Sequence, residues 1–361
     1  MKIFFLNWNS YGSEDIKEAF EKEGASLFLY PFSKSVPRRD PETEAALNSA
    51  IENEKPDCVF SFNYFPIVST VCERLHVKYV SFVYDSPHVV LYSYTVLNKC
   101  NEIFLFDSAE YNKFARSGIK TMHYLPLCAN PDRISRLISD SKTAFRSDIT
   151  FVGALYTEKE RYVSNLTTSP DGIETKEWLY EEYVKNRILT GAERINLINK
   201  AAEIPGKTVT LFTHGEKEEI CRESAFEILN GGASDTLLIP GISKNVHVMP
   251  PCHPDKEAPI VYNHSNVNLC ITLKSIHSGV PLRAFEIMAS KGLLLMNHQK
   301  DMDDIFTEGE DYLMYESEWD FDKKIKEALN RDNTPMIERA FDKLKENHTY
   351  RNRVREMFKY V

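Results

Sequence analysis

Short apolar runs that alternate with amphipathic stretches are the feature that most constrains the fold of this chain. The first two runs are KIFFLNW and ASLFLYPF, and the stretch between them, SEDIKEAFEKEG, has its apolar residues at helical spacing. The same alternation continues as far as DYLMYE, close to residue 315. Apolar runs joined by helices are typical of parallel sheets with helices on both faces, so the sequence predicts an α/β protein.

A chain of 361 residues is long enough for two domains. The polar stretch ANPDRISRLISDSKTAFRSD interrupts the alternating pattern and marks the expected linker. We therefore expect two doubly wound, Rossmann-like domains that face each other across a cleft. They would cover residues 1–145 and 146–339, with a carboxy-terminal helix at about 340–361 that could return to the first domain. Ligands of such sheets bind at the carboxyl ends of the strands.

The charge, the apolar runs and the cysteines of the chain argue against a nucleic-acid partner, a membrane span and a metal site. A net charge of −9 argues against a nucleic-acid partner, which would require a basic surface. The amino terminus lacks the pattern of a signal peptide and no apolar run is long enough to span a bilayer, so we expect a cytoplasmic protein with at most peripheral membrane contact. The seven cysteines lack a metal-ligand spacing, and Asp301-Met302-Asp303-Asp304 suits the start of a helix, so we expect no metal site.

The segment SGVPLRAFEIMASKG, residues 278–292, places two charged side chains on an otherwise apolar helix. A phosphate could bind at its amino end, where Ser278 and Gly279 allow close approach to free N–H groups. Arg283 would then contact a diphosphate, and Glu286 would accept hydrogen bonds from two vicinal hydroxyls. The alternative is a plain ion pair between Arg283 and Glu286 on a solvated face, and the spacing alone does not favour the functional interpretation over it.

Asp85 and His88 follow a predicted strand of the first domain, so their side chains should project toward the cleft. A carboxylate and an imidazole there would orient an acceptor hydroxyl or take its proton. The alternative, which is the more frequent outcome for such a match, is an Asx turn in which Asp85 caps the helix that begins near His88. Asp107, at the end of EIFLFD, is interpreted as the N-cap of the next helix.

Three loop residues could bind phosphate or base. Lys274 and His277 lie in the loop that precedes the helix of residues 278–292, and they would supply cationic contacts to a diphosphate. His214 ends the run KTVTLFTHG, where a base or a phosphate could rest. A surface turn is an equally acceptable interpretation for His214, and a solvated loop residue is the slightly favoured interpretation for His277.

The run from Tyr262 to Asn297 resembles the nucleotide-sugar half of two-domain GT-B glycosyltransferases, in particular the CgeB-like (spore maturation) group. SFVYDSPH and HYLPLCANP resemble the domain that precedes it in that group, and FVGALYTEKERY resembles the opening strand and loop of the donor domain. The resemblance therefore covers most of the chain, although only residues 278–292 form a fairly specific motif.

The resemblance also implies roles for individual residues. Gly153 would face the donor phosphates. Glu286 matches the second glutamate of the related retaining transferases, which contacts the ribose of the donor. Ser278 stands where those enzymes have the first glutamate, which contacts the donor sugar, so this chain departs from the broader pattern at that position.

The function implied is that of a metal-independent glycosyltransferase. It would take a sugar from a nucleoside diphosphate, with UDP favoured, in the second domain and pass it to a protein, glycan or small-molecule acceptor in the first. Retention of the anomeric configuration is expected if Asp85 and His88 only position the acceptor, and inversion if one of them is a true base. Two other classes stay open: a non-catalytic protein that binds nucleotide sugars or serves spore or surface assembly, and, with less support, a nucleotide-sugar epimerase.

Overall fold

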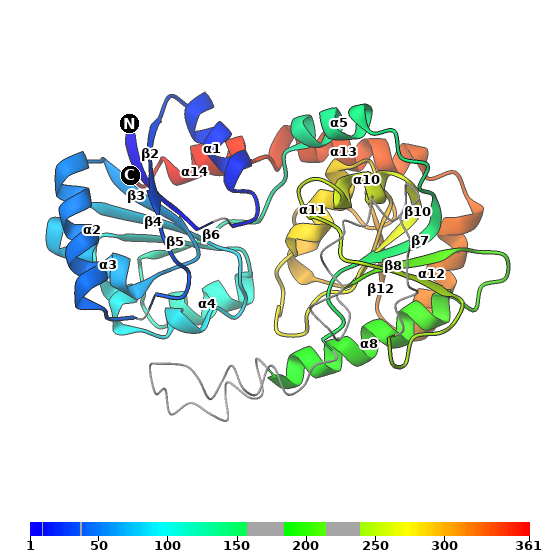
Figure 1. Cartoon of the computed structure of the whole chain (residues 1–361). Helices are drawn as coiled ribbons and strands as arrows, with labels where there is room; N and C mark the ends of the chain where they lie inside the picture. The colour runs from blue at the N-terminus through cyan, green and yellow to red at the C-terminus, as the bar shows by residue number, and fades with distance from the viewer. Residues whose placement is uncertain (9, 37, 157–183, 214–238) are drawn as a thin grey trace.

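The computed structural model describes residues 1–8, 10–36, 38–156, 184–213 and 239–361. The chain forms two lobes, and each lobe is built on a six-stranded sheet (Figure 1). All paired strands in both sheets are parallel. This arrangement confirms the predicted α/β class and its two doubly wound sheets.

The first sheet has the strand order β2-β1-β3-β4-β5-β6. Its strands are β1 Lys2–Asn7, β2 Ser26–Pro31, β3 Cys58–Phe62, β4 Lys78–Val83, β5 Asn101–Leu105 and β6 Met122–Tyr124. Side chains of β1 alternate between two cores: Ile3 and Phe5 face one side of the sheet, and Phe4 and Leu6 the other. Because both faces are covered, the inner strands read as continuous apolar runs rather than alternating ones.

Two α-helices of the first lobe, α2 and α4, begin at a side-chain cap. The Asp40 side chain accepts a hydrogen bond from the backbone of Thr43 at the start of α2, and Asp107 accepts one from Ala109 at 3.0 Å at the start of α4. This confirms Asp107 as an N-cap. The helical elements are α1 Ser13–Lys22, α2 Pro41–Glu54, α3 Pro66–Leu75, α4 Ser108–Arg116 and the 3₁₀ turns η1 Val89–Leu91 and η2 Tyr94–Leu97.

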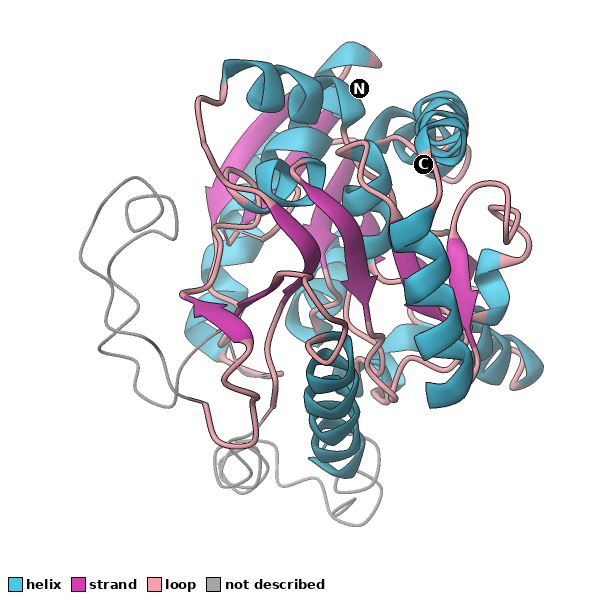
Figure 2. Ribbon diagram, turned by 90° about the vertical axis from the view of Figure 1, so that its right-hand side faces the viewer, coloured by secondary structure: helices cyan, strands magenta, loops and turns pink. Residues whose placement is uncertain are grey.

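The second sheet has the order β12-β11-β10-β7-β8-β9. Its strands are β7 Ser147–Val152, β8 Val209–Phe212, β9 Val246–Met249, β10 Ser265–Cys270, β11 Leu294–Asn297 and β12 Leu313–Tyr315. The helical elements with it are α5 Pro131–Asp140, α8 Asn186–Ala201, α10 Ala258–Asn263, α11 Leu282–Ala289, η5 Lys300–Met302, α12 Glu318–Asn330 and α13 Thr334–Asn347. Figure 2 shows the strands enclosed between layers of helices. Helix α5, in the stretch expected to be a linker, packs against α10 and α13.

The chain crosses between the lobes twice, and the two crossings lie side by side. After β6 it enters the second lobe, and after α13 it returns as α14, Tyr350–Met357, which packs on α1 (Figure 1). The backbone N–H of Ala129 donates to the carbonyl of His348 at 3.2 Å, which joins the outgoing and returning segments. Two neighbouring segments of the chain therefore connect the lobes, and we call these two crossings the hinge.

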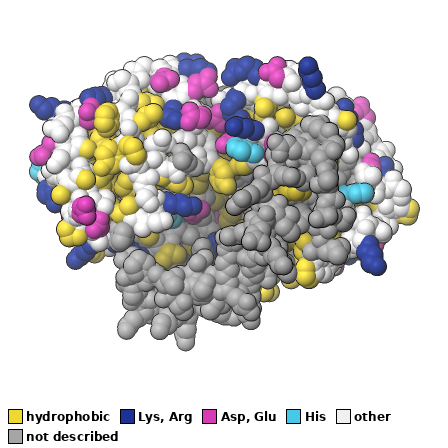
Figure 3. All heavy atoms as spheres, viewed as in Figure 1, with side chains coloured by type: hydrophobic (Ala, Val, Ile, Leu, Met, Phe, Trp, Pro, Cys, Tyr) yellow, Lys and Arg dark blue, Asp and Glu magenta, His cyan; other side chains and the backbone are white. Residues whose placement is uncertain are grey.

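The surface carries charges of both signs. Figure 3 shows acidic and basic side chains interspersed over the visible face of both lobes. Among the described residues, none of the helices is both long and apolar enough to cross a bilayer.

Candidate functional site

A pocket of about 330 Å³ lies at the carboxyl ends of β7 and β8. Gly153 and Thr213, which follow these strands, form part of its wall, and α11 contributes Arg283 and Glu286. Tyr11, in the loop after β1, reaches it from the first lobe. The pocket therefore lies where ligands of doubly wound sheets bind, and it brings together three residues that the sequence singled out.

Arg283 lies over the end of β7. Its guanidinium carbon is 5.3 Å from the centre of the Phe151 ring, within the range of a cation–π contact. Gly153 leaves room for it, because a Cβ atom on residue 153 would lie 2.5 Å from Nη2 of Arg283. No carboxylate of the described residues forms an ion pair with Arg283, so its fork of donors is available to a ligand in the pocket.

Glu286 faces the same pocket one helical turn further on. Burial raises the pKa of its carboxyl to about 7, the negative charge of Asp255 adds to this effect, and Arg283 opposes it. The described part of the chain gives Glu286 no side-chain hydrogen bond, and the alternative of an ion pair with Arg283 is not observed there. An acidic and a basic group thus face one cavity without neutralising each other.

Arg194 is a residue that the sequence reasoning missed. It comes from α8 and is buried, and its guanidinium donates to the backbone carbonyls of Ile271 and Ala154, at 2.6 Å each. It also lies 5.3 Å from the Phe151 ring, so two guanidinium groups approach the same strand end. Burial lowers the pKa of Arg194, and the positive charge of Arg283 contributes to the shift. The available signal was an arginine at helical spacing with Leu197 and Ile198 on an apolar face.

Comparisons with known proteins agree with this geometry. Residues 195–359, somewhat less than half of the chain, match a family model described as glycosyl transferase-like. No curated protein matches the chain. A UDP-forming α,α-trehalose-phosphate synthase from Burkholderia xenovorans has a similar structure, with a TM-score of 0.60 and 11% identity over 100% of this chain and 99% of its own.

Two further solved structures show the same likeness. A sucrose-phosphate synthase from Thermosynechococcus elongatus has a TM-score of 0.60 and 10% identity, over 99% of this chain and 98% of its own. HepE from Anabaena, in complex with UDP and glucose, has a TM-score of 0.58 and 12% identity, with both chains fully covered. The chain has the GT-B fold. The CgeB-like assignment stays a prediction.

The two lobes of this GT-B fold meet at the loop that was expected to bind phosphate, and Ser278 and Gly279 lie in this contact. The Ser278 hydroxyl donates to Asp107 at 2.8 Å and accepts from the backbone N–H of Ala109 at 2.8 Å. A Cβ atom on Gly279 would lie 2.8 Å from the Phe106 ring. Both residues are buried against the first lobe, so in this arrangement neither is open to a ligand.

The second lobe also contributes a carboxylate to this contact between the lobes. Asp301, in η5 of the second lobe, accepts hydrogen bonds from the backbone N–H of Ser108, at 2.9 Å, and from its hydroxyl. Asp107 of the first lobe in turn accepts from the backbone N–H of His277 at 2.9 Å. Each lobe thus presents an aspartate to the other, and we call Asp107, Ser108, Ser278 and Asp301 the interlobe seam.

The remaining phosphate candidates are not gathered in the GT-B pocket. Lys274 is exposed and forms an ion pair with Glu193 at 2.7 Å. His277 is exposed, and its backbone is held by the interlobe seam. His214 lies outside the described residues. Of the residues predicted for the donor side, the structure therefore brings together Gly153, Arg283 and Glu286.

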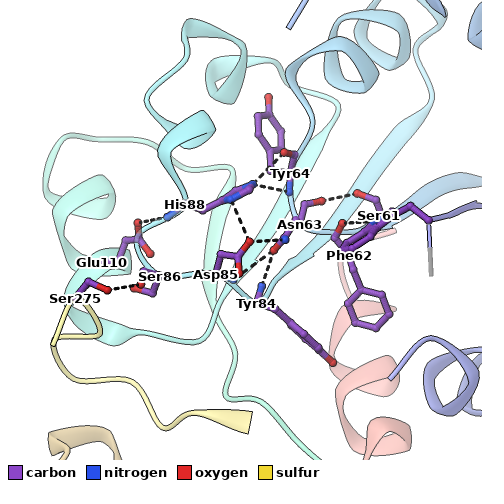
Figure 4. A network of polar contacts seen from close by, with 11 residues as sticks. Ser61, Phe62, Asn63, Tyr64, Tyr84, Asp85, Ser86, His88, Glu110 and Ser275 are labelled. Carbon is purple, nitrogen blue, oxygen red and sulfur yellow. Dashed lines mark hydrogen bonds and ion pairs between the residues drawn. The ribbon is translucent and has the colours of Figure 1, made fainter. Parts of the chain in front are cut away.

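Asp85 and His88 lie in a hydrogen-bonded network in the first lobe (Figure 4). The side chain of His88 is 14% exposed, and its Nε2 accepts from the backbone N–H of Tyr64 at 3.2 Å. Burial lowers the pKa of His88 although Asp85 opposes the shift, so the imidazole is neutral. Nδ1 lies 3.9 Å from the Asp85 carboxylate, too far for a hydrogen bond. His88 therefore stabilises this loop through its hydrogen bond and is not a solvent-exposed side chain.

Asp85 has a different environment. Its side chain is 67% exposed and accepts a hydrogen bond from Asn63 Nδ2 at 2.8 Å. The turn η1 begins at Val89 with no side-chain cap, so the expected cap from Asp85 is not formed. The next residue, Ser86, accepts a hydrogen bond at its carbonyl from Ser275 of the second lobe (Figure 4). The carboxylate thus belongs to a loop that lies between the two lobes of the GT-B fold.

Proposed function

We propose that this protein is a glycosyltransferase that takes a sugar from a nucleoside diphosphate held in the second lobe. The observation that carries the proposal is the pair Arg283 and Glu286, which face one pocket and form no ion pair with any described residue. A nucleoside diphosphate offers negative charge to Arg283 and the hydroxyls of its ribose as donors to Glu286. The glycosyl transferase-like match over residues 195–359 supports this choice of chemistry.

Three features of the pocket suit a nucleoside diphosphate. Arg283 would bind the diphosphate in a forked contact, with the buried charge of Arg194 behind it raising the local positive potential. Glu286 would accept hydrogen bonds from the ribose hydroxyls. The Thr213 hydroxyl is buried and unpartnered among the described residues, and it offers a hydrogen bond to the base or ribose. Because HepE was solved with UDP, we propose UDP as the nucleotide.

The acceptor would approach from the first lobe, with Asp85 orienting its hydroxyl. In the reaction the bond between the anomeric carbon and the β-phosphate oxygen breaks, and a bond to the acceptor oxygen forms on the same face of the sugar. The acceptor proton passes to an oxygen of the leaving phosphate. Arg283 stabilises the charge that develops on the diphosphate, so the proposal needs no metal ion for that task. We propose retention because Asp85, in this proposal, orients the acceptor hydroxyl and does not take its proton.

The test is calorimetric titration of UDP, GDP and dTDP into the wild type and into Arg283→Ala and Glu286→Ala. We expect micromolar binding of UDP that each substitution weakens by more than tenfold, about 1.4 kcal/mol. Lys291→Ala is the matched control, because Lys291 follows the same helix but pairs with Glu338 on the surface. It should leave the affinity unchanged.

Turnover separates the proposed enzyme from its alternatives. UDP release from UDP-sugars, measured with a panel of acceptors, should be detected in the wild type and lost in Arg283→Ala. Binding of UDP-sugar without any release would favour the non-catalytic binding protein instead. Interconversion of UDP-sugars without release of UDP would favour an epimerase. Absence of nucleotide binding would remove the central support of the proposal.

A further inference from the structure

The first lobe carries an exposed apolar surface that the proposed function does not use. It is formed by η2, by the residues next to it and by the end of α4. Tyr94 is 66% exposed and Leu97 is 63% exposed, although both are large apolar side chains in a well-packed lobe. A shallow hollow of about 390 Å³ lies beside them, with Phe114 and Ile119 among its lining residues. A contiguous apolar surface of this kind usually marks a contact site.

One basic side chain lines this hollow, and three more lie close to its lining residues in the sequence. Lys99 follows Leu97, Lys113 lines the hollow, and Arg116 and Lys120 lie further along α4 and the turn after it. All four are exposed, and none forms an ion pair with a described residue. We call Tyr94, Leu97, Lys99, Lys113, Arg116 and Lys120 the η2–α4 surface.

No exposed carboxylate balances these charges within residues 86–121, all of which the structure describes. Glu102 is largely buried and is bound to Lys78 and to His123. Asp107 and Glu110 are buried beneath α4. The whole chain has a net charge of −9, so the η2–α4 surface has the opposite sign to the molecule that carries it.

Tyr94 is held in place rather than left free. Its hydroxyl accepts a hydrogen bond from Arg39 Nη2 at 2.7 Å, and the Arg39 guanidinium lies 5.8 Å from the ring centre. The ring therefore presents a fixed edge, with a polar tip and a further cation at its side. A tyrosine with an apolar ring and a polar tip is typical of the boundary between water and lipid.

We propose that the η2–α4 surface docks the protein onto an anionic lipid bilayer. Leu97 and Tyr94 would enter the headgroup region, and the long stems of the lysines would lie along it with their ammonium groups on lipid phosphates. Each cation near an anionic surface adds to the attraction between the protein and the bilayer. The acidic remainder of the molecule is repelled, which fixes the orientation of the docked protein.

The chemistry favours a bilayer over other anionic partners. A soluble polyanion such as a nucleic acid would use the cations but gains nothing from an exposed leucine. A bilayer with anionic headgroups satisfies both features at once.

The test is co-sedimentation of the full chain with vesicles of phosphatidylcholine, with or without phosphatidylglycerol. We expect binding only to the anionic vesicles, weakening as the salt concentration rises. The double variants Tyr94→Ser with Leu97→Ser, and Lys113→Gln with Arg116→Gln, should each reduce binding more than tenfold. Trp319→Ser is the matched control, because Trp319 is 75% exposed on α12 of the other lobe and should have no effect.

Three results would overturn the proposal. These are equal binding to neutral vesicles, binding that neither double variant reduces, and no binding at all. Inorganic polyphosphate serves as the soluble competitor. If it displaced the protein completely and bound the Tyr94→Ser, Leu97→Ser variant as tightly as the wild type, the surface would be a site for soluble anions.

All substituted side chains are exposed, so thermal unfolding should confirm that each variant is folded. The experiment involves no nucleotide, and its failure would leave the proposed transferase unaffected.

Discussion

Gly153 controls where Arg283 can lie. A methyl group at position 153 would meet the Arg283 guanidinium at 2.5 Å, and the φ of Gly153, 152°, is one that alanine rarely adopts, so both the arginine and the backbone after β7 would shift. We predict that Gly153→Ala weakens UDP binding by about tenfold, close to the effect of Arg283→Ala. The double variant should then bind no more weakly than Arg283→Ala alone, because both changes remove the same contact. Calorimetric titration of the four proteins measures this coupling, and strictly additive losses would show that the glycine acts independently.

Glu286 makes nucleotide binding dependent on pH. With a pKa raised to about 7 by burial, the carboxyl is half protonated at neutral pH, and hydroxyl donors from a ribose favour its charged form. UDP binding near pH 7 should therefore release up to about half a proton from Glu286, and the affinity should fall as the pH drops from 8 to 6. Glu286→Gln should lose this part of the proton release and keep only the contribution of the phosphate. Titrations in buffers of different ionisation enthalpy measure the protons released, and equal release by both proteins would contradict the prediction.

At the scale of elements, the strands could be predicted well and the loops could not. Every strand of both sheets coincides with an apolar run, because a doubly covered parallel strand needs apolar residues on both of its faces. Helix α11 was also predictable, from the local spacing of Phe285 and Met288. The loop before it was not, because Ser278 binds Asp107 and Ala109, which lie about half the chain away. Arg194 could not be predicted for the same reason, because its hydrogen-bond partners are carbonyls of distant loops.

The interlobe seam gives a physical reason for a serine at position 278. The Ser278 side chain is buried between Asp107 and the Ser108 hydroxyl, which itself binds the carboxylate of Asp301. A glutamate there would add a third carboxylate to a site closed to water. We predict that Ser278→Glu destabilises the protein by on the order of 2–4 kcal/mol and separates the lobes, whereas Ser278→Ala costs about 1 kcal/mol. Urea unfolding of both variants measures the difference, and a Ser278→Glu protein as stable as Ser278→Ala would refute this account.

At the scale of the whole molecule, the hinge decides how the two lobes can move. Its central residue is Arg353 of α14, which is buried and donates to the carbonyls of Pro126 at 2.6 Å and Leu127 at 2.9 Å in the outgoing crossing. Arg353 Nη2 also donates to Nδ1 of His348 at 2.8 Å. Burial, together with the positive charge of Arg353, lowers the pKa of His348 to about 3, so this imidazole stays a neutral acceptor. The return of a carboxy-terminal helix could be anticipated from its pattern, but this set of partners could not.

We predict that Arg353→Met loosens the connection between the lobes. Methionine fills much of the same volume but leaves the carbonyls of Pro126 and Leu127 unpaired, at a cost of about 2–5 kcal/mol. The melting temperature should fall by several degrees, and the radius of gyration from small-angle X-ray scattering should increase as the lobes separate. Arg355→Met is the matched control, because Arg355 lies on the same helix in an exposed pair with Glu23 and should contribute less than about 1 kcal/mol. If Arg353→Met lowered the melting temperature without changing the radius of gyration, Arg353 would stabilise α14 locally, and the control of lobe movement would have to lie in the interlobe seam instead.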